Sequence, residues 1–359
     1  MPGEFDFIQE IRRQAVQQAR PAGDLVFGIG DDAAIWREQT GRETLVTVDL
    51  LVENVDFKLE YALPRWLGHK ALAVSLSDIA AMGGAPKYSL LTLAIPPNLK
   101  SQTSNPEAVT FWKEFFAGYF ALAATHGVQL VGGDISSAPD RLTIDSIVIG
   151  QCSAGRAVRR SGAKVGNGIY VTGALGASAA GLRLLLNGAR VGDAGNAAFR
   201  RLRNELSEGR VTDATAMRAH LRPEPRVEFG RKLGEFGLAT AMLDVSDGLA
   251  QDLSHLCEDS GVGAVLEFDA VPVAEEVSLV TANADEAFAL AISGGEDFEL
   301  LFTADAKNEA ELMNLAAGCP LRLTRIGKVV SAGQSPRLQL RRDGQLKPLP
   351  IRGYDHFAI

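Results

Sequence analysis

Cysteine is scarce in this sequence, and long apolar runs are absent. The three cysteines, Cys152, Cys257 and Cys319, lie far apart and form no CxxC pair, so the sequence supports neither a disulfide framework nor a zinc site. No apolar stretch reaches the roughly 18 to 20 residues that a membrane span needs, and the segment MPGEFDFIQEIRR lacks the apolar core of a secretion signal. We therefore expect a cytoplasmic protein with no membrane partner.

Basic residues are in the minority. Lys and Arg total 36 against 44 Asp and Glu, which gives a formal net charge of −8. Since no basic block is present either, this balance argues against a nucleic-acid partner. An acidic protein that handles phosphates needs bound cations, because two like charges about 4 Å apart cost roughly 4 kcal/mol at an effective dielectric constant near 20. Metal ions therefore belong to any phosphate-handling hypothesis.

Common nucleotide-binding patterns are missing or out of context. The sequence has no G-x-x-x-x-G-K-[ST] loop and no protein-kinase H-R-D or D-F-G motif, so a phosphoryl-transfer site would need another construction. The stretch GIGDDA matches the dinucleotide fingerprint G-x-G-x-x-G/A, with Asp49 at a suitable distance. However, two carboxylates would face the pyrophosphate, and IWREQTG soon reaches a turn where a phosphate-binding helix is required. This context argues against an oxidoreductase.

The length of the chain and the order of its elements predict two domains. At 359 residues the chain is longer than a domain with a single hydrophobic core usually is. The Gly-, Ser- and Arg-rich segment 153–168 reads as a connection, so we predict domains at 1–152 and 153–359. Helical periodicity and β-branched runs alternate in both halves, which predicts an α/β fold of the mixed α+β kind.

Periodicity, caps and turn residues also predict the individual elements. The first half should contain helices at 6–19, from Pro64 to the glycines at 83–84, and from Asn105 onwards, with strands at 44–51, 88–95 and 142–150 and a short strand ending in VGGD. The second half should contain the strand IYVTG, a helix at 177–186, helices after Pro225 and Asp247, and strands around TAMLDV, FELLFTA and LRLTRIGKVV. We interpret the polar segment 187–222 as a solvated surface insertion with no chemistry of its own.

Acidic residues in loops and at strand ends are the first candidates for a site. They are Asp31 and Asp32 in GIGDDAA, Asp49 in VTVDLL, Asp78 in LSDIAAMGG, Asp134 in VGGD, and Asp244 and Asp247 in DVSDGL. Turns also explain Asp31, Asp32 and Asp134, and a helix cap also explains Asp247.

Asp49 and Asp78 are harder to explain as ordinary surface residues. Asp49 interrupts a β-branched strand, and Asp78 lies on an apolar helical stripe, where an unpaired carboxylate is costly. An exposed edge strand for Asp49 and the N-cap of a short helix IAAM for Asp78 remain alternatives. As a set, the carboxylates suggest magnesium, which prefers oxygen ligands and phosphate oxygens.

Glycine-rich loops would complement these carboxylates. VGGD and SGGED, together with the basic RRSGAK, would supply backbone amides and positive charge to a phosphate. A simple turn into the strand FELLFT is the alternative for Gly294 and Gly295 of SGGED.

The order of the motifs resembles one known family. Along nearly the whole chain the sequence contains, in this order, GEFDFI, GIGDDAA, VTVDLLVENVDF, KALAVSLSDIAAMGG, LVGGD, RSGAK, YVTGALGASAAGL, LRPEPR, DVSDGLAQDL, SGGEDFELLF and GYDHF. This series is similar to the thiamine-monophosphate kinases, and single pieces are shared with aminoimidazole ribonucleotide synthetase and the hydrogenase maturation factor HypE. The resemblance implies a two-domain fold similar to aminoimidazole ribonucleotide synthetase. It also implies a homodimer formed by the N-terminal domain and a C-terminal domain that closes over the nucleotide.

The resemblance also implies site residues, position by position. Magnesium positions match Asp32, Thr47, Val48, Asp49, Asp78, Asp134, Asp244 and Asp247; ATP contacts match Gly133, Asp134, Arg160 and Ser246; substrate contacts match Glu296 and Tyr354. Two positions depart from the family pattern. Val48 stands where the family often has Thr, so a ligand there must be the backbone carbonyl. Asp56 of VENVDF stands where the family usually has a substrate-facing His. We expect Asp56 to contact the substrate in its place, and a solvent-facing Asp56 is the alternative.

The implied reaction is a magnesium-dependent transfer of the ATP γ-phosphoryl group to thiamine monophosphate, giving thiamine diphosphate and ADP. The acceptor phosphate has a second pKa near 6 and is largely ionised at neutral pH, so no catalytic base or side-chain nucleophile is expected. Two alternatives stay open: another ATP-dependent synthetase of the same superfamily, or a non-catalytic dimer that binds magnesium and nucleotide.

Overall fold

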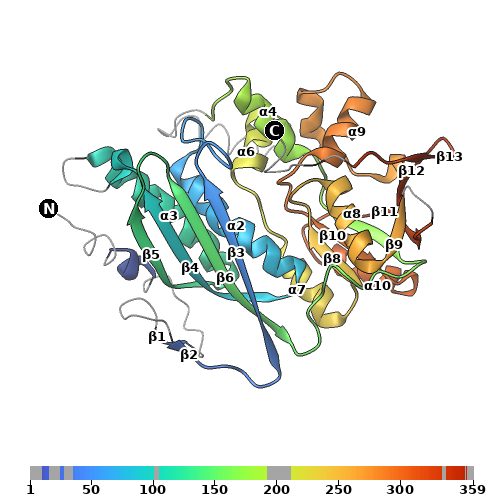
Figure 1. Ribbon diagram of the computed structural model, residues 1–359, viewed down its shortest axis with the longest axis horizontal. Coiled ribbons are helices and arrows are strands. Elements are labelled where there is room, and N and C mark those ends of the chain that lie inside the picture. Colours follow the sequence, from blue (N-terminus) through green and yellow to red (C-terminus); the bar gives the residue numbers. More distant parts are fainter. Residues whose placement is uncertain are drawn as a thin grey trace. The chain divides into compact units, whose positions relative to one another are not determined.

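The structure is a computed structural model that describes residues 10–15, 25–27, 35–100, 105–191, 212–333, 337–351 and 353. Contacts divide the chain into two compact units, one of residues 1–79 and 84–155, the other of residues 80–83 and 156–359. Each unit combines helices with a sheet (Figure 1), so the mixed α/β prediction is confirmed. The domain boundary at 152/153 stays a prediction.

The first unit is built on a four-stranded sheet with the strand order β3-β6-β4-β5. Its strands are β3 (Arg42–Val52), β6 (Thr143–Ser153), β4 (Ala85–Ile95) and β5 (Gln129–Ser137). β6 pairs antiparallel with β3 and β4, and β5 runs parallel to β4. The short strands β1 (Leu25–Phe27) and β2 (Ile35–Trp36) form a separate antiparallel pair.

Two long helices, α2 (Pro64–Ala81) and α3 (Pro106–His126), belong to this unit (Figure 1). Asn105 caps α3, as predicted, by accepting a hydrogen bond from the Ala108 amide. The Ser75 hydroxyl of α2 lies 3.0 Å from the Ser146 carbonyl oxygen of β6. α2 is buried over nearly its whole length, so a polar residue on it has to find its partners inside the protein.

The second unit is built on a seven-stranded sheet with the order β13-β12-β9-β11-β7-β10-β8. Its strands are β7 (Gly168–Thr172), β8 (Ala241–Asp244), β9 (Val262–Glu267), β10 (Leu300–Ala304), β11 (Leu323–Ser331), β12 (Leu338–Arg342) and β13 (Gln345–Pro348). The pairings are antiparallel apart from β12 with β9, which is parallel.

The helices of the second unit are α4 (Ala177–Leu186), α6 (Asp213–Leu221), α7 (Val227–Phe236), α8 (Leu249–Ser260), α9 (Ala284–Ser293) and α10 (Glu309–Ala317). Single 3-10 turns lie at η1 (Pro97–Leu99) in the first unit and at η2 (Phe268–Ala270), η3 (Glu275–Leu279) and η4 (Ala306–Asn308) in the second. In the part of the chain that the structure describes, no helix has the length and apolar character needed to cross a membrane.

Most predicted elements are present with small shifts at their ends. The strand predicted to end at VGGD continues to Ser137 as β5, and the helix predicted at 177–186 has those same bounds. Of the helix predicted at 6–19, residues 10–15 are helical and the rest lie outside the described residues. The sequence argument did not predict β9, α9, α10, β12 or β13.

The interpretation of 187–222 as a solvated insertion is wrong for its last part. Residues 192–211 lie outside the described residues, but α6 follows them, with a capping box between Thr212 and Thr215. Ala216, Met217 and His220 of α6 are buried. Their spacing places them on one face of the helix, so α6 packs into the unit and does not lie free in solvent.

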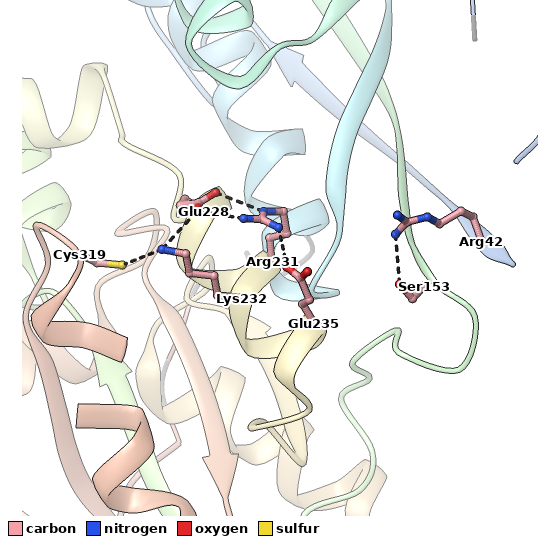
Figure 2. Close-up of polar contacts among 7 residues, drawn as sticks. All are labelled: Arg42, Ser153, Glu228, Arg231, Lys232, Glu235 and Cys319. Carbon is pink, nitrogen blue, oxygen red and sulfur yellow. Dashed lines mark hydrogen bonds and ion pairs between the residues drawn. The ribbon is translucent and has the colours of Figure 1, made fainter. Parts of the chain in front are cut away.

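The exposed side of α7 carries a cluster of charges (Figure 2). The Arg231 guanidinium lies 3.0 Å from the Glu228 carboxylate and 2.6 Å from Glu235, at helical spacings of three and four residues. The Lys232 ammonium lies 3.3 Å from Glu228 and 3.8 Å from the Cys319 sulfur. Pairs of this kind contribute about 0.3 to 0.5 kcal/mol each, so they fix which side of α7 faces solvent more than they stabilise the fold.

A glycine contact holds α2 and α3 together. A Cβ added at Gly118 of α3 would lie 1.7 Å from the Arg65 carbonyl oxygen, and one added at Gly68 of α2 would lie 1.9 Å from the Phe115 carbonyl oxygen. Both obstructing atoms are backbone atoms, which cannot swing aside. The two helix axes therefore approach more closely here than any side chain would permit.

We expect Gly118→Ala to destabilise the protein, although alanine favours a helix by about 1 kcal/mol over glycine. The overpacking cost should exceed that gain and lower the apparent free energy of unfolding by about 1 to 3 kcal/mol, measured by thermal or urea unfolding. Gly333→Ala is the matched control, because a Cβ there meets no atom within 4 Å. Equal stability of the two variants would contradict the close-packing argument.

Candidate functional site

The inner face of β3 carries two of the predicted site residues. Val46, Val48 and Leu50 are exposed, whereas Thr47 and Asp49 alternate with them and are half-buried. This is the period of two that a strand imposes on its side chains. Asp49 pairs in register with Ser146 of β6, which puts it on the sheet face that α2 contacts.

α2 brings a second carboxylate to the same place. The Thr47 hydroxyl donates a hydrogen bond to Asp78, and the Ser75 hydroxyl lies 2.7 Å from Oδ2 of Asp49. Ser75 and Asp78 are three residues apart on α2 and so share one face of the helix. The structure therefore brings the predicted residues Thr47, Asp49 and Asp78 together. Ser75 was not predicted, and its only signal was its spacing from Asp78.

The electrostatics of this group favour a bound cation. Burial, followed by the charges of Asp78 and Asp145, raises the pKa of Asp49 to about 6, against the lowering effect of the hydrogen bond from Ser75. Keeping Asp49 ionised at neutral pH thus costs free energy. Every donor in the group is an oxygen atom, the ligand type that magnesium takes. These residues fit a magnesium ion on both counts.

Both alternatives for these carboxylates fail. Asp78 lies inside the continuous helix α2 and does not cap a separate short helix. β3 is an edge strand, but Asp49 lies on the face toward α2 and not on the face that carries exposed Val46 and Val48. The placement of each carboxylate therefore needs another explanation than solvent exposure or capping.

Gly133 and Asp134 lie in a different environment. Asp134 is exposed and shares a register row with Thr92 and Asp145, on the face opposite to Asp49. It lies within β5 and not in a turn. A Cβ at Gly133 would lie 2.0 Å from the Leu91 carbonyl oxygen, so the strand pairing itself requires glycine there.

No metal-binding group of three or more His, Cys, Asp or Glu side chains occurs among residues 10–15, 25–27, 35–100, 105–191, 212–333, 337–351 and 353. Asp31 and Asp32 lie outside these ranges. Within the first unit, the structure thus joins Thr47, Asp49 and Asp78 and leaves Asp134 apart.

In the second unit the DVSDGL loop connects β8 to α8. Asp244 is buried at the end of β8. Asp252, in the first turn of α8, accepts hydrogen bonds at Oδ2 from the amides of Asp247 (3.2 Å) and Gly248 (3.0 Å), which precede the helix. The cap interpretation of Asp247 is wrong, because the N-cap of α8 is Gly248 and no side chain caps the helix. Burial, followed by the charges of Asp244 and Asp247, raises the pKa of Asp252 to about 8.

The SGGED loop lies directly against the DVSDGL loop. The Glu296 amide donates to the Ser246 carbonyl (2.8 Å) and the Phe298 amide to the Val245 carbonyl (2.9 Å). A Cβ at Gly295 would lie 2.4 Å from the Ser246 carbonyl oxygen. Ser246 and Glu296, predicted on different motifs, are thus brought together by backbone contacts.

The SGGED loop is also strained and anchored. Glu296 and Phe298 have φ of 63° and 50°, a region that residues other than glycine rarely adopt. The Asp297 carboxylate accepts hydrogen bonds from the amides of Gly176 (2.6 Å) and Ser178 (3.1 Å) at the start of α4. Burial raises the pKa of Asp297 to about 7. The loop leads into β10, as the alternative of a simple turn expects, but the Asp297 hydrogen bonds also attach it to the start of α4.

An ion pair between half-buried Arg226 and buried Glu299 lies beside this loop and was not predicted. Arg226, which precedes α7, donates from Nε to Oε2 of Glu299 at 2.7 Å, and the Thr172 hydroxyl of β7 donates to the same oxygen at 2.6 Å. Arg226, Glu299 and Asp297 line a cavity of about 510 Å³, together with Arg218 of α6. The only sequence signal was the position of Arg226 in LRPEPR.

The remaining candidates lie on loops. Arg160 is exposed, and its carbonyl accepts a hydrogen bond from Ser260 (3.3 Å). Asp56 is half-buried, and its Oδ2 accepts a hydrogen bond from the Val52 amide (2.8 Å). Tyr354 lies outside the described residues.

Comparison of the sequence with known proteins shows to which family the chain belongs. The model of the "AIR synthase related protein, N-terminal domain" matches residues 30–152, and that of the corresponding C-terminal domain matches residues 164–338. The thiamine-monophosphate kinase of Bacillus subtilis (strain 168) is 37% identical over 354 residues, 99% of each chain. That of Escherichia coli (strain K12) is 35% identical over 93% of each chain. This chain belongs to the thiamine-monophosphate kinase family.

Solved structures of thiamine-monophosphate kinases have the same fold. The crystal structure of the enzyme from Stenotrophomonas maltophilia K279a has a TM-score of 0.78 and 34% identity, covering 96% of this chain and 97% of that one. The structure titled AaThiL complexed with AMPPCP and TMP has a TM-score of 0.71 and 28% identity, covering 99% and 97%. A structure of Hydrogenase Maturation Protein HypE in complex with ATP, at 15% identity and a TM-score of 0.70, shares the fold alone. The predicted fold is confirmed.

The buried charge of Asp49 should affect the stability of the protein differently without and with divalent cations. Without divalent cations, Asp49→Asn should raise the free energy of unfolding at neutral pH by about 1 to 3 kcal/mol, because it removes a costly buried charge. With excess magnesium chloride, the variant should gain less stability than the wild type, because a ligand is lost. Thermal unfolding in EDTA and in magnesium measures both effects.

Asp140→Asn is the control for this experiment, since the Asp140 side chain is 74% exposed and surface substitutions usually stay within about 0.5 kcal/mol. A less stable Asp49→Asn variant with an unchanged response to magnesium would contradict the assignment.

Proposed function

We propose that this chain is a thiamine-monophosphate kinase that transfers the γ-phosphoryl group of ATP directly to thiamine monophosphate, giving thiamine diphosphate and ADP. The main support is the sequence similarity to proteins of that name over nearly the full length of this chain. A structural relative bound to AMPPCP, an ATP analogue, and TMP adds support for both substrates.

We further propose that the family's positions apply here residue by residue. Magnesium is assigned to Asp32, Thr47, the Val48 carbonyl, Asp49, Asp78, Asp134, Asp244 and Asp247; ATP to Gly133, Asp134, Arg160 and Ser246; and the substrate to Asp56, Glu296 and Tyr354. The contact of Thr47 with Asp78 and the raised pKa of Asp49 support the first set. Bound magnesium would supply positive charge that screens the phosphates from one another.

The residues of the chain then act by position and charge. An acceptor phosphate is largely ionised at neutral pH, so the site needs no side chain to take a proton from it. Arg160 supplies fixed positive charge, and Glu296, held by the Ser246 carbonyl through its backbone, faces the substrate. Asp56 keeps its carboxylate oriented through the Val52 amide. This division of labour predicts that both substrates bind together before transfer.

Oligomeric state belongs to the same proposal. Val46, Val48 and Leu50 are 66%, 61% and 58% exposed on the outward face of edge strand β3. A row of apolar side chains on an edge strand invites pairing with another chain. We propose that a second copy covers it in a homodimer. The cytoplasmic location and the absence of nucleic-acid and membrane partners stay predictions from the sequence.

The reaction is tested with labelled ATP, magnesium and a panel of acceptors, followed by separation of the products. We expect thiamine diphosphate and ADP in equal amounts, sequential steady-state kinetics, and no product in EDTA. Label that accumulates on the protein would reject direct transfer. Product with another acceptor only would favour a synthetase of the same superfamily, and ATP binding without turnover would favour a non-catalytic nucleotide-binding dimer.

The dimer is tested by Val46→Lys, which places a charge in the proposed interface. We expect the wild type to have twice the mass of the chain in light scattering after gel filtration, and the variant to dissociate to monomers at micromolar concentration. Val109→Lys is the matched control, because Val109 is also exposed, at 46%, but lies on α3. A wild type that is monomeric at every concentration would refute the proposed dimer.

A further inference from the structure

His220 of α6 connects the segment 187–222 to the SGGED loop. The ring is buried, with 3% of the residue exposed. Its Nδ1 lies 3.1 Å from Oε2 of Glu296 and 3.1 Å from the hydroxyl oxygen of Ser178 on α4. Three separate pieces of the chain therefore meet at one ring nitrogen.

The carboxylate decides which ring nitrogen carries the proton. A lone pair on Nδ1 would face the oxygen of Glu296, and two acceptors repel each other. With a proton on Nδ1, the ring donates to Glu296, and the Ser178 oxygen is a second acceptor within the same reach. The hydrogen-bond geometry therefore assigns the proton to Nδ1.

The same geometry excludes a nucleophilic triad. In a Ser-His-acid triad the two ring nitrogens serve different partners, one the serine and the other the acid. Here Ser178 and Glu296 approach the same nitrogen, and Ser178 is only 1% exposed. Ser178 and His220 are therefore not arranged as a nucleophile and its base.

Hydrogen bonds fix the main chain on both sides of the Glu296 side chain. The Glu296 amide is bound to the Ser246 carbonyl, and the next residue, Asp297, is bound to the start of α4. The Glu296 side chain is 30% exposed, in contrast to the buried ring that touches it. The His220 ring nitrogen is a donor to one of its carboxylate oxygens, and a charge-assisted hydrogen bond of this kind favours one orientation of the carboxylate.

We propose that His220 is a positioning residue that orients the Glu296 carboxylate toward thiamine monophosphate. This inference rests on the proposed function, in which Glu296 contacts the substrate. A carboxylate held in this way accepts hydrogen bonds, so the substrate group it meets is an N–H donor, such as an amino group on a heterocycle. The segment 187–222 then serves the site through α6, which carries His220 to the loop.

The test compares His220→Ala with His220→Asn, because the Asn amide nitrogen restores a donor close to the place of Nδ1. We expect His220→Ala to raise the KM for thiamine monophosphate roughly tenfold or more, the loss of one charge-assisted hydrogen bond, with kcat and the KM for ATP within about twofold. His220→Asn should recover most of the loss. Met217→Ala is the matched control, a buried change on the same helix that should lower the melting temperature without changing either KM.

A double variant separates positioning from direct contact. If His220 acts through Glu296, adding His220→Ala to Glu296→Gln should raise the KM no further. Additive increases, an unchanged KM in His220→Ala, or a loss that His220→Asn does not recover would overturn the inference.

Failure of the proposed function is recognised separately. Wild-type protein that makes no thiamine diphosphate rejects the function itself. In that case the crystal structure of His220→Ala still decides the positioning role: a displaced Glu296 side chain supports it, and an unmoved one overturns it.

Discussion

Like charges held close together in poorly hydrated surroundings constrain both units. In the first unit, Asp49 and Asp78 face each other between β3 and α2, and burial together with the neighbouring charge raises the pKa of Asp49 to about 6. In the second unit, Asp252 has a pKa raised to about 8 beside Asp244 and Asp247. Such groupings cost the fold free energy that a bound cation would offset, and the proposed magnesium-nucleotide substrate would bring such a cation.

The rest of each unit holds these groups in place at a structural cost. Gly68 and Gly118 allow α2 and α3 to approach closely, and α2 in turn carries Ser75 and Asp78 to the sheet. In the second unit, Glu296 and Phe298 occupy rarely populated backbone conformations, which persist because backbone bonds to the DVSDGL loop and the Asp297 bonds to α4 over-determine them. Backbone strain thus occurs at the candidate residue Glu296, and the close helix contact in the first unit lies on the helix that carries Asp78.

His220 gives the second unit a further layer of support. Asp297 binds the SGGED loop to the start of α4, while His220 contacts the neighbouring side chain of Glu296. Ser178 contacts both Asp297 and His220: its amide donates to the Asp297 carboxylate, and its hydroxyl oxygen lies within hydrogen-bond distance of the His220 ring. A loop that is fixed at the backbone and at the side chain needs little reorganisation to bind a substrate.

The sequence by itself determined the types of most elements, the family and the suspicion that Asp49 and Asp78 belong together, because these depend on periodicity and on motifs read along the chain. Only the tertiary structure decided which residues surround them. Ser75 and Asp49 are 26 residues apart, Arg226 and Glu299 are 73 apart, and Ser178 and Asp297 are 119 apart. Helical and strand periods report which face a residue occupies, but not which distant segment packs against that face. For that reason the contacts of Asp252 with the amides of Asp247 and Gly248, the burial of α6 and the contact of His220 with Glu296 became apparent only in the folded chain.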